Sequence, residues 1–224
     1  ASFAGHLARA IAEAWPVVSA ACEERGQTRY LEEVSLPLAR VLARMQRIGI
    51  GADATIFDAL GKEFTERRLK VEKRIHKLAG RKFNVGSGKQ LGAVLFDELK
   101  LPVLKRTKTG YSTAADVLER LAPKHEIATL VVDWRALAKL VNTYTRVLSE
   151  AIRPDTGRIH CRVQQTVSAS GRLISTDPDL QRTPIRTPDG RRIREAFVAE
   201  KGFVMVSADW SQIELRILAH ITED

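Results

Sequence analysis

Two long helical patterns on either side of a polar stretch constrain the fold of this chain more than any other feature of its sequence. The first begins at Asp53, a residue type that caps helices, and runs to about Ala79. Its apolar stripe consists of Phe57, Leu60, Phe64, Val71, Ile75 and Leu78. The second, from about His125 to Ile152, has a stripe of Leu130, Trp134, Leu137, Val141 and Leu148. Because both stripes need burial, the sequence predicts a long antiparallel helix pair.

The polar stretch between the two patterns forms a predicted tip. It comprises Lys82–Leu91, a short helix to about Leu99, and the basic segment Lys100–Thr113. Basic side chains neutralise phosphates and N–H groups at the start of a helix bind them, so the tip could grip a nucleic-acid backbone. Taken alone, the composition favours a solvated loop, because charged runs usually face water.

The segment Gly86–Lys89 superficially resembles a nucleotide-binding P-loop. That motif needs its first glycine where this chain has Phe83, and it needs Ser or Thr where this chain has Gln90. These two mismatches argue against an ATPase.

The N-terminal region is predicted to be helical. Residues 1–25 are rich in Ala and Leu and favour one or two helices interrupted at Trp15-Pro16, because proline fits only the first turn of a helix. A further amphipathic helix is predicted from Tyr30 to Ile48, ending at Gly49. Its apolar face is expected to be core and consists of Leu31, Val34, Leu38, Val41, Leu42 and Met45.

After Ile152 the pattern changes. Arg153–Arg158 is a predicted turn, and Ile159–Val167 alternates between apolar and polar residues as a strand does. The sequence therefore places a domain boundary near residue 153. The stretch Gly171–Pro184 has too many turn residues for regular structure.

A buried strand that ends in a carboxylate is predicted at Phe203–Asp209. The next residues have a helical pattern, in which Ser211 and Glu214 have the spacing of a capping box. The apolar face of this helix consists of Ile213, Ile217, Leu218 and Ile221. A strand, a carboxylate and a helix make a corner suited to a metal ion, with Asp209 as its ligand. The alternative is that Asp209 is only a helix N-cap.

Composition indicates a soluble globular protein with a polyanionic partner. The 224 residues are 44% hydrophobic and 28% charged, with a formal net charge of +9 and a pI near 9.8. This basic excess fits DNA, RNA or an anionic membrane surface. The sequence contains no run of about 18 apolar residues, so it predicts no membrane-spanning helix. Cys22 and Cys161 form no metal-ligand cluster or disulfide framework, which favours a reducing compartment. From the residues at its two ends, we expect the chain to be a piece of a longer protein.

Two motifs carry a resemblance to a known family. Ser207–Arg216 reads Ser-Ala-Asp-Trp-Ser-Gln-Ile-Glu-Leu-Arg and resembles the first palm motif of family A DNA polymerases, the bacterial DNA polymerase I type. Ser170–Gln181 is similar to that family's Thr-Gly-Arg-Leu-Ser-Ser-x-x-Pro-Asn-Leu-Gln. The resemblance covers residues 30–224. It implies an α+β fold: a mainly helical thumb, built on a long antiparallel helix pair with a basic tip, and then the first strands and the motif helix of a palm.

The resemblance also implies three parts. Residues 1–29 would be the end of an exonuclease-like domain or linker helices, residues 30–152 the thumb and its base, and residues 153–224 the N-terminal part of the palm. The acidic constellation of a proofreading exonuclease is not in the first part. A fingers helix and a second aspartate motif should follow Asp224, so the fragment alone is expected to bind DNA without catalysis.

In the family, the matching residues serve template-directed DNA synthesis with two Mg²⁺ ions. The positions that match catalytic residues are Asp209, Glu214 and Arg172, and Asp209 is also the metal ligand. The positions that match nucleotide-binding residues are Arg186, Gln212 and Glu214. The Glu214 side chain would occupy the room that a ribose 2′-hydroxyl needs. Arg172 and Gln181 would donate to the minor-groove acceptors that all correct base pairs share.

The resemblance reverses the interpretation of the tip, because the helix pair and its polar end match the family's thumb. The positions expected to contact DNA are Asn84, Ser87, Lys89, Gln90, Lys105, Arg106, Lys108, Ser112, Thr113, Arg172 and Gln181. The implied partners are primer–template DNA and deoxynucleoside triphosphates, with no membrane, and the implied state is a monomer. A bacterial source would place the protein in the cytoplasm with the nucleoid, and an organellar source would also fit.

The chain departs from the family pattern in four places. Ile174 replaces a usual serine, Asp179 a usual asparagine, Arg182-Thr183 a usual Asn-Ile, and Trp210 a usual tyrosine. A carboxylate at position 179 would repel a phosphate backbone. The alternative to an enzyme is a non-catalytic DNA-binding module that keeps the thumb and early palm as a scaffold.

Overall fold

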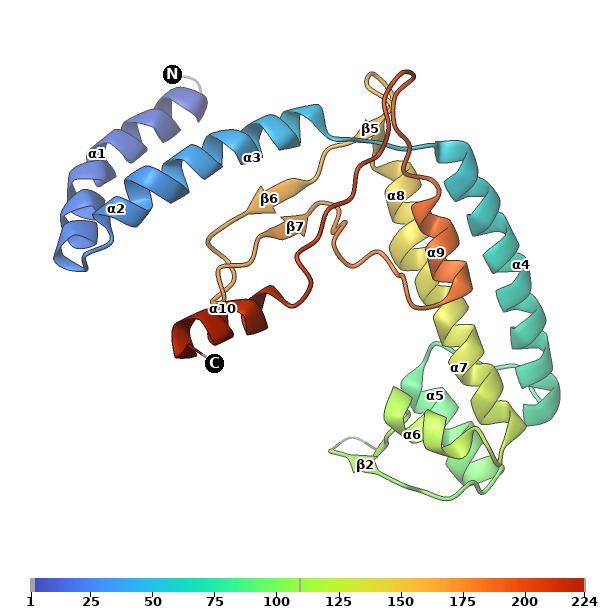
Figure 1. Ribbon diagram of the computed structural model, residues 1–224. Helices are drawn as coiled ribbons and strands as arrows, with labels where there is room; N and C mark the ends of the chain where they lie inside the picture. The colour runs from blue at the N-terminus through green and yellow to red at the C-terminus, as the bar shows by residue number, and fades with distance from the viewer. Residues whose placement is uncertain (1–2, 109, 224) are drawn as a thin grey trace.

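The computed structural model describes residues 3–108 and 110–223. Figure 1 shows an N-terminal helical arm and a long helical stalk that meet at a small sheet. The arm contains α1 (Phe3–Glu24), α2 (Thr28–Tyr30), the π-helix η1 (Leu31–Ser35) and α3 (Leu36–Ile48). The stalk contains α4 (Ala54–Ala79), α7 (Glu126–Lys139), the π-helix η3 (Leu140–Thr145) and α8 (Arg146–Glu150).

The stalk confirms the predicted helix pair. α4 begins where Asp53 Oδ1 accepts a hydrogen bond from the Thr55 N–H at 2.8 Å, and it ends at Gly80, whose φ of 73° is left-handed. The returning helix runs from α7 through η3 to α8, whereas Ile152, its predicted end, lies in a strand. The two predicted stripes pack into the interface, except that Leu78 is 38% exposed.

Two hydrophobic cores divide the stalk along its length. The tip core joins α4 and α7 to α5 (Gly88–Gly92), the π-helix η2 (Ala93–Glu98) and α6 (Ala115–Leu121). Its fully buried residues include Ile75, Leu91, Val94, Leu95, Leu118 and Val131. The base core joins α4 to the returning helix and to α9 (Pro188–Arg194), and its fully buried residues include Phe57, Phe64, Leu148, Ile159, Ile193 and Ala196. Burial of each large apolar side chain contributes about 1.5–3 kcal/mol, so each core stabilises its own end of the stalk.

Short antiparallel strands complete an α+β fold, the predicted class. In the part of the chain that the structure describes, three sheets form: β1 (Ile50–Gly51) with β5 (Arg158–Ile159) and β4 (Ile152–Arg153), β2 (Arg106–Thr107) with β3 (Gly110–Tyr111), and β6 (Arg162–Gln164) with β7 (Ile174–Thr176). The first sheet joins the segment before α4 to the hairpin after α8. The boundary predicted at residue 153 therefore falls within a sheet that both sides share.

Two predictions for the segments after residue 153 are wrong in detail. The strand predicted for Ile159–Val167 is divided, because β5 belongs to one sheet and β6 to another. Between them, His160 leaves the ladder, and its Nδ1 lies within hydrogen-bond distance of Gln46 O, at 2.9 Å. The stretch Gly171–Pro184, expected to be irregular, contains β7, because β6 offers it a pairing partner.

The N-terminal arm also differs from its prediction. α1 runs through Pro16 without interruption, because its Ala-rich flanks have high helix propensity and proline removes only one hydrogen bond.

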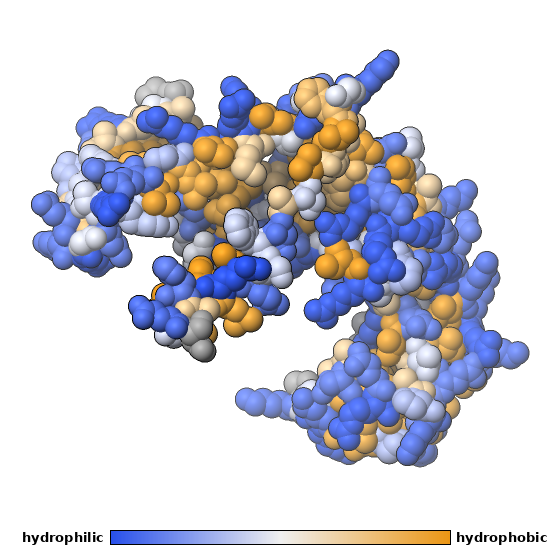
Figure 2. Space-filling view, viewed as in Figure 1, coloured by the Kyte–Doolittle hydropathy of each residue, from blue (hydrophilic) through white to orange (hydrophobic). Residues whose placement is uncertain are grey.

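The expectation that the face of residues 30–48 is core is wrong for Val34, Val41 and Met45, which are 46%, 55% and 52% exposed, whereas Leu42 is buried. The short strand β6 covers only part of this face, and Figure 2 shows hydrophobic surface over the arm. Among residues 3–108 and 110–223, no helix is long and apolar enough to cross a membrane.

Candidate functional site

The segment that carries Asp209 is an extended trace leading to α10 (Ile213–Thr222), as Figure 1 shows. The buried strand predicted here is wrong, because residues 203–210 have no regular secondary structure and Phe203 and Val204 are 72% and 81% exposed. A strand needs a neighbour for its N–H and C=O groups, and no strand in the described part of the chain pairs with this segment. Asp209 is therefore exposed as well.

The start of α10 is not the predicted capping box. Gln212 precedes the helix with a left-handed φ of 53°, and no side chain caps the first turn. This conformation keeps the Ser211 hydroxyl from capping the helix. Ser211 instead uses its carbonyl oxygen, which accepts a hydrogen bond from Arg216 Nε at 2.9 Å.

One ion pair brings the two family signatures together. Arg172 Nη2 donates to Glu214 Oε1 at 2.6 Å across 42 residues of sequence. The hydrogen bond from the Glu214 backbone N–H, and then the Arg172 guanidinium, hold the pKa of Glu214 below its usual value. Both side chains are exposed, so the pair adds little to stability. Its significance is that two predicted catalytic residues lie at hydrogen-bond distance.

Gln181 organises the loop that follows Arg172. Its Oε1 accepts a hydrogen bond from the Ser175 N–H at 2.7 Å, and its Nε2 donates to the Leu173 carbonyl oxygen at 2.8 Å. Both ends of the amide are thus used inside the loop. An amide NH₂ group has two donors, so Nε2 has a second N–H to offer to a base-pair acceptor while it holds the Leu173 carbonyl.

Two departures from the family pattern, Asp179 and Arg182, form an ion pair. Asp179 Oδ2 lies 3.3 Å from Arg182 Nε, and Asp179 Oδ1 accepts hydrogen bonds from the Gln181 N–H and the Ser175 hydroxyl at 3.1 and 3.3 Å. Arg182 thereby offsets the carboxylate that would repel a phosphate backbone. Sequence reasoning missed this pair, although opposite charges three residues apart were a readable signal.

Hydrogen bonds to the backbone shape the turn at the tip. Asn84 Oδ1 accepts from the Gly86 N–H at 2.9 Å, and Gln90 Oε1 accepts from the Asn84 N–H at 2.8 Å. Ser87 Oγ accepts from the Gln90 N–H at 3.4 Å. Asn84, Ser87 and Gln90 each use an oxygen acceptor in the turn and keep N–H or O–H donors. Such donors suit the phosphate and minor-groove acceptors of a duplex.

Ser112 and Thr113 are fixed by contacts inside the tip. Ser112 is buried, and its Oγ accepts from the Ala114 N–H at 3.4 Å. Arg135 donates to the Thr113 carbonyl oxygen and, at 3.1 Å, to the Thr113 hydroxyl. Burial lowers the pKa of Arg135. Sequence reasoning missed Arg135, because nothing in the helical pattern distinguishes it from its charged neighbours.

An open pocket of about 590 Å³ lies between α5 and the β2–β3 hairpin. Its polar lining includes Lys89, Asp97, Tyr111 and Thr113. The Tyr111 hydroxyl donates to Asp97 Oδ1 at 2.5 Å, and this hydrogen bond raises the pKa of Tyr111. The pocket thus combines a lysine with hydroxyl groups at the end of the stalk, where Figure 2 shows mainly hydrophilic surface.

The predicted basic residues of the tip have weak partners. The Arg106 guanidinium lies 4.9 Å from the centre of the Tyr111 ring, and Lys105 Nζ lies 3.9 Å from Asp116 Oδ2. Lys89 and Lys108 are exposed. Exposed pairs of this kind contribute little, so these cations can exchange their partners for phosphate.

The predicted nucleotide-binding residues are only partly brought together. Arg186 is exposed in the loop before α9, and Gln212 is exposed at the start of α10. Glu214 is the member engaged with Arg172. Arg192, which lies six residues after Arg186, forms a salt bridge with Glu63 instead of standing free for a nucleotide.

Asp209 fits one ligand position of a magnesium site. Its carboxylate supplies the hard oxygen atoms that Mg²⁺ prefers, and Mg²⁺ is often held by one or two carboxylates with substrate phosphates. No group of three or more His, Cys, Asp or Glu side chains suited to a metal occurs among the residues that the structure describes. Asp209 thus offers a single exposed carboxylate to such a site.

Comparison with known sequences identifies a family. The profile of DNA polymerase family A matches residues 54–224. The chain is 48% identical to DNA polymerase I of Geobacillus stearothermophilus over 100% of this chain and 26% of that protein. It is 49% identical to the thermostable DNA polymerase I of Thermus thermophilus over 89% of this chain and 25% of that protein. The chain thus spans only 25–26% of the length of these relatives.

A solved structure has the same fold. The POL domain of Pol1 from M. smegmatis, in complex with DNA primer-template and dNTP, matches with a TM-score of 0.84 and 40% sequence identity. The match covers 92% of this chain and 36% of that chain. The similarity therefore includes most of the arm, the stalk and the segments that follow them.

Proposed function

Because the chain belongs to DNA polymerase family A, we propose that it supplies the DNA-binding thumb and the first catalytic segment of an enzyme that extends a primer on a DNA template. The observation that carries this proposal is the Arg172–Glu214 ion pair, which joins the two signatures at one place. The proposed parts are residues 1–29 as the end of an upstream exonuclease-like domain or linker helices, residues 30–152 as the thumb and its base, and residues 153–224 as the N-terminal part of the palm. We also propose that the protein is a monomer and that it acts on nucleoid DNA.

The tip is proposed to hold the duplex without reading its sequence. The N–H and O–H donors of Asn84, Ser87 and Gln90 would meet phosphate or minor-groove acceptors. Lys89, Lys105, Arg106 and Lys108 would neutralise phosphates. Counterion release then supplies most of the attraction, so binding should weaken steeply as salt rises.

Next to the primer end, Arg172 is proposed to act on two groups at once. A guanidinium has five N–H donors, so its contact with Glu214 leaves others for a minor-groove acceptor. Glu214 would then be held beside the sugar of the incoming nucleotide, where its side chain fills the space of a 2′-hydroxyl. Gln181 would test the same groove from the neighbouring loop.

Asp209 is proposed to be one ligand of the metal pair. When bound, two Mg²⁺ ions would favour ionisation of the primer 3′-hydroxyl and neutralise the leaving pyrophosphate. Arg186 and Gln212 would bind the incoming deoxynucleoside triphosphate, because a bidentate arginine suits phosphate oxygens. Positioning and charge neutralisation are the main sources of such catalysis.

A non-catalytic DNA-binding module is the second candidate function. It is favoured by the exposure of Asp209 and by the fact that no described acidic cluster surrounds it. On this alternative the tip would serve the same purpose, and the palm segment would be a scaffold.

Primer extension by the full-length protein separates the two candidates. Asp209→Asn keeps the side-chain shape and removes the charge, so the enzyme proposal predicts loss of extension with normal DNA binding. Asp155→Asn, an exposed aspartate paired with Arg153 in a turn, is the matched control and should extend normally. Ordinary extension rates in the Asp209→Asn protein would reject the catalytic role.

A further inference from the structure

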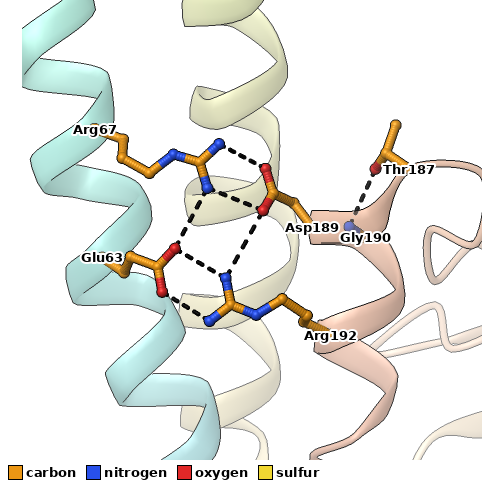
Figure 3. A network of polar contacts seen from close by, with 6 residues as sticks. All are labelled: Glu63, Arg67, Thr187, Asp189, Gly190 and Arg192. Carbon is orange, nitrogen blue, oxygen red and sulfur yellow. Dashed lines mark hydrogen bonds and ion pairs between the residues drawn. The ribbon is translucent and has the colours of Figure 1, made fainter.

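Four charged side chains from α4 and α9 form a closed ring of alternating charge (Figure 3). Arg67 Nη1 and Nη2 donate to Asp189 Oδ1 and Oδ2 at 2.9 and 2.8 Å, and Arg192 Nη1 and Nη2 donate to Glu63 Oε1 and Oε2 at 2.8 and 2.7 Å. Cross contacts of 3.3 Å from Arg67 to Glu63 and 3.8 Å from Arg192 to Asp189 close the ring. We call these four residues the charge clamp.

The clamp is more constrained than an ordinary surface ion pair. Its side chains are 27–43% exposed, and both guanidiniums lie over the ring of Phe64, at 5.7 and 5.8 Å from its centre. Two-point arginine–carboxylate contacts fix orientation as well as distance. The clamp therefore opposes sliding or rotation of α9 along α4.

The position of α9 determines the position of the residues just before it. Thr187 caps α9, with its Oγ1 accepting from the Gly190 N–H at 3.1 Å. A Cβ added at Gly190 would lie 2.8 Å from Pro184 Cβ and 2.9 Å from Thr187 Oγ1, so the chain folds tightly back on itself here. Arg186 lies inside this tight segment, directly before the cap.

We propose that the charge clamp positions Arg186 for the triphosphate of the incoming nucleotide, so that Glu63, Arg67, Asp189 and Arg192 are positioning residues for nucleotide binding. This inference rests on the proposed polymerase function of Arg186. The route is mechanical: α4 holds α9 through the clamp, and α9 holds the capped segment that carries Arg186. None of the four clamp residues has to touch the nucleotide.

The test is steady-state primer extension by the full-length protein and its Arg67→Met variant, which keeps the alkyl stem and removes the guanidinium. The KM for deoxynucleoside triphosphate should rise about 3- to 10-fold, which lies within the range of coupling between neighbouring residues. The kcat and the Kd for primed DNA should stay close to those of the unchanged protein. Asp189→Asn, which preserves shape, should raise the KM in the same direction and covers the case in which Arg67→Met does not fold.

Arg74→Met is the matched control. Arg74 lies on the same helix, but its ion pair is with Glu126 of α7 and not with α9. The KM of the Arg74→Met variant for deoxynucleoside triphosphate should equal that of the unchanged protein. An unchanged KM in both clamp variants, with only a lower Tm, would overturn the proposal, because a purely structural role predicts that result.

The Arg186→Ala variant, alone and combined with Arg67→Met, tests the clamp proposal separately from the proposed nucleotide-binding role of Arg186. If Arg186→Ala raises the KM and the Arg67→Met effect disappears in the double variant, the clamp acts through Arg186. If Arg186→Ala raises the KM but the two effects multiply, the clamp proposal is wrong and the proposed function stands. If Arg186→Ala leaves the KM unchanged, the nucleotide-binding role of Arg186 is wrong, and the clamp proposal fails with it.

Discussion

The tip of the stalk and the segment that carries Asp209 are opposite kinds of structure. The tip closes over its own core, in which Leu95 and Leu118 are fully buried, and its turn is held by side-chain hydrogen bonds. The Asp209 segment is extended, unpaired among the described strands, and exposed at Phe203 and Val204. The proposed DNA-binding surface thus rests on a packed core, whereas the proposed catalytic segment does not.

The largest expected difference between the tip and the Asp209 segment is in how much a substitution lowers the free energy of unfolding. Leu95→Ala should lower the free energy of unfolding of the chain by about 2–5 kcal/mol, because it leaves a cavity in the tip core. Val204→Ala should change it by less than about 0.5 kcal/mol, because Val204 is 81% exposed. Urea unfolding followed by circular dichroism measures both. Equal losses would show that the Asp209 segment is packed after all.

A smaller effect concerns the contact between α4 and α9. The Arg192 hydrogen bonds lower the pKa of Glu63 to about 2. A depressed pKa of a carboxyl stabilises the fold above the unfolded-state value near 4.5, and this contribution is lost as the pH falls toward 2. Because Glu63 is 41% exposed, we expect on the order of 1 kcal/mol after allowance for solvent screening.

Glu63→Gln provides the measurement. At pH 7 the variant should unfold at lower urea concentration than the unchanged chain, and the gap should shrink between pH 4.5 and pH 2. Glu126→Gln, which disrupts the exposed pair with Arg74, is the control and should show a smaller gap at pH 7. A gap that does not change with pH would mean that the charge of Glu63 does not stabilise the α4–α9 contact.

The same comparison explains what could be predicted from the sequence. The stalk was predicted correctly because its information is local: Asp53 caps α4, Gly80 ends it, and the 3.6-residue stripes mark the buried faces. The strand before Asp209 was predicted from local information too, but a strand forms only with a partner. Its prediction failed for a reason that no reading of residues 203–208 could have revealed.

The candidate site shows a similar division. The motifs singled out Arg172 and Glu214 separately, and the structure adds that they meet. The capping box failed because the left-handed backbone at Gln212 is a conformational choice that residue type does not specify. The clamp between α4 and α9 joins Glu63 to Arg192 across 129 residues, a distance over which charge patterns give no guidance.

Fluorescence anisotropy of the 224-residue chain with primed duplex DNA, between about 50 and 200 mM salt, tests the central claim most directly. We expect binding without sequence preference that weakens steeply with salt. Lys89→Ala/Lys105→Ala/Lys108→Ala should flatten the log–log salt slope by about 0.9 for each phosphate that the variant no longer neutralises. Arg40→Ala/Arg44→Ala/Arg47→Ala, with the same change in net charge on exposed positions of α3, should flatten it less. Equal slopes for the two triple variants, or no binding by the unchanged chain at the lowest salt, would contradict the claim that the tip is a DNA-binding surface.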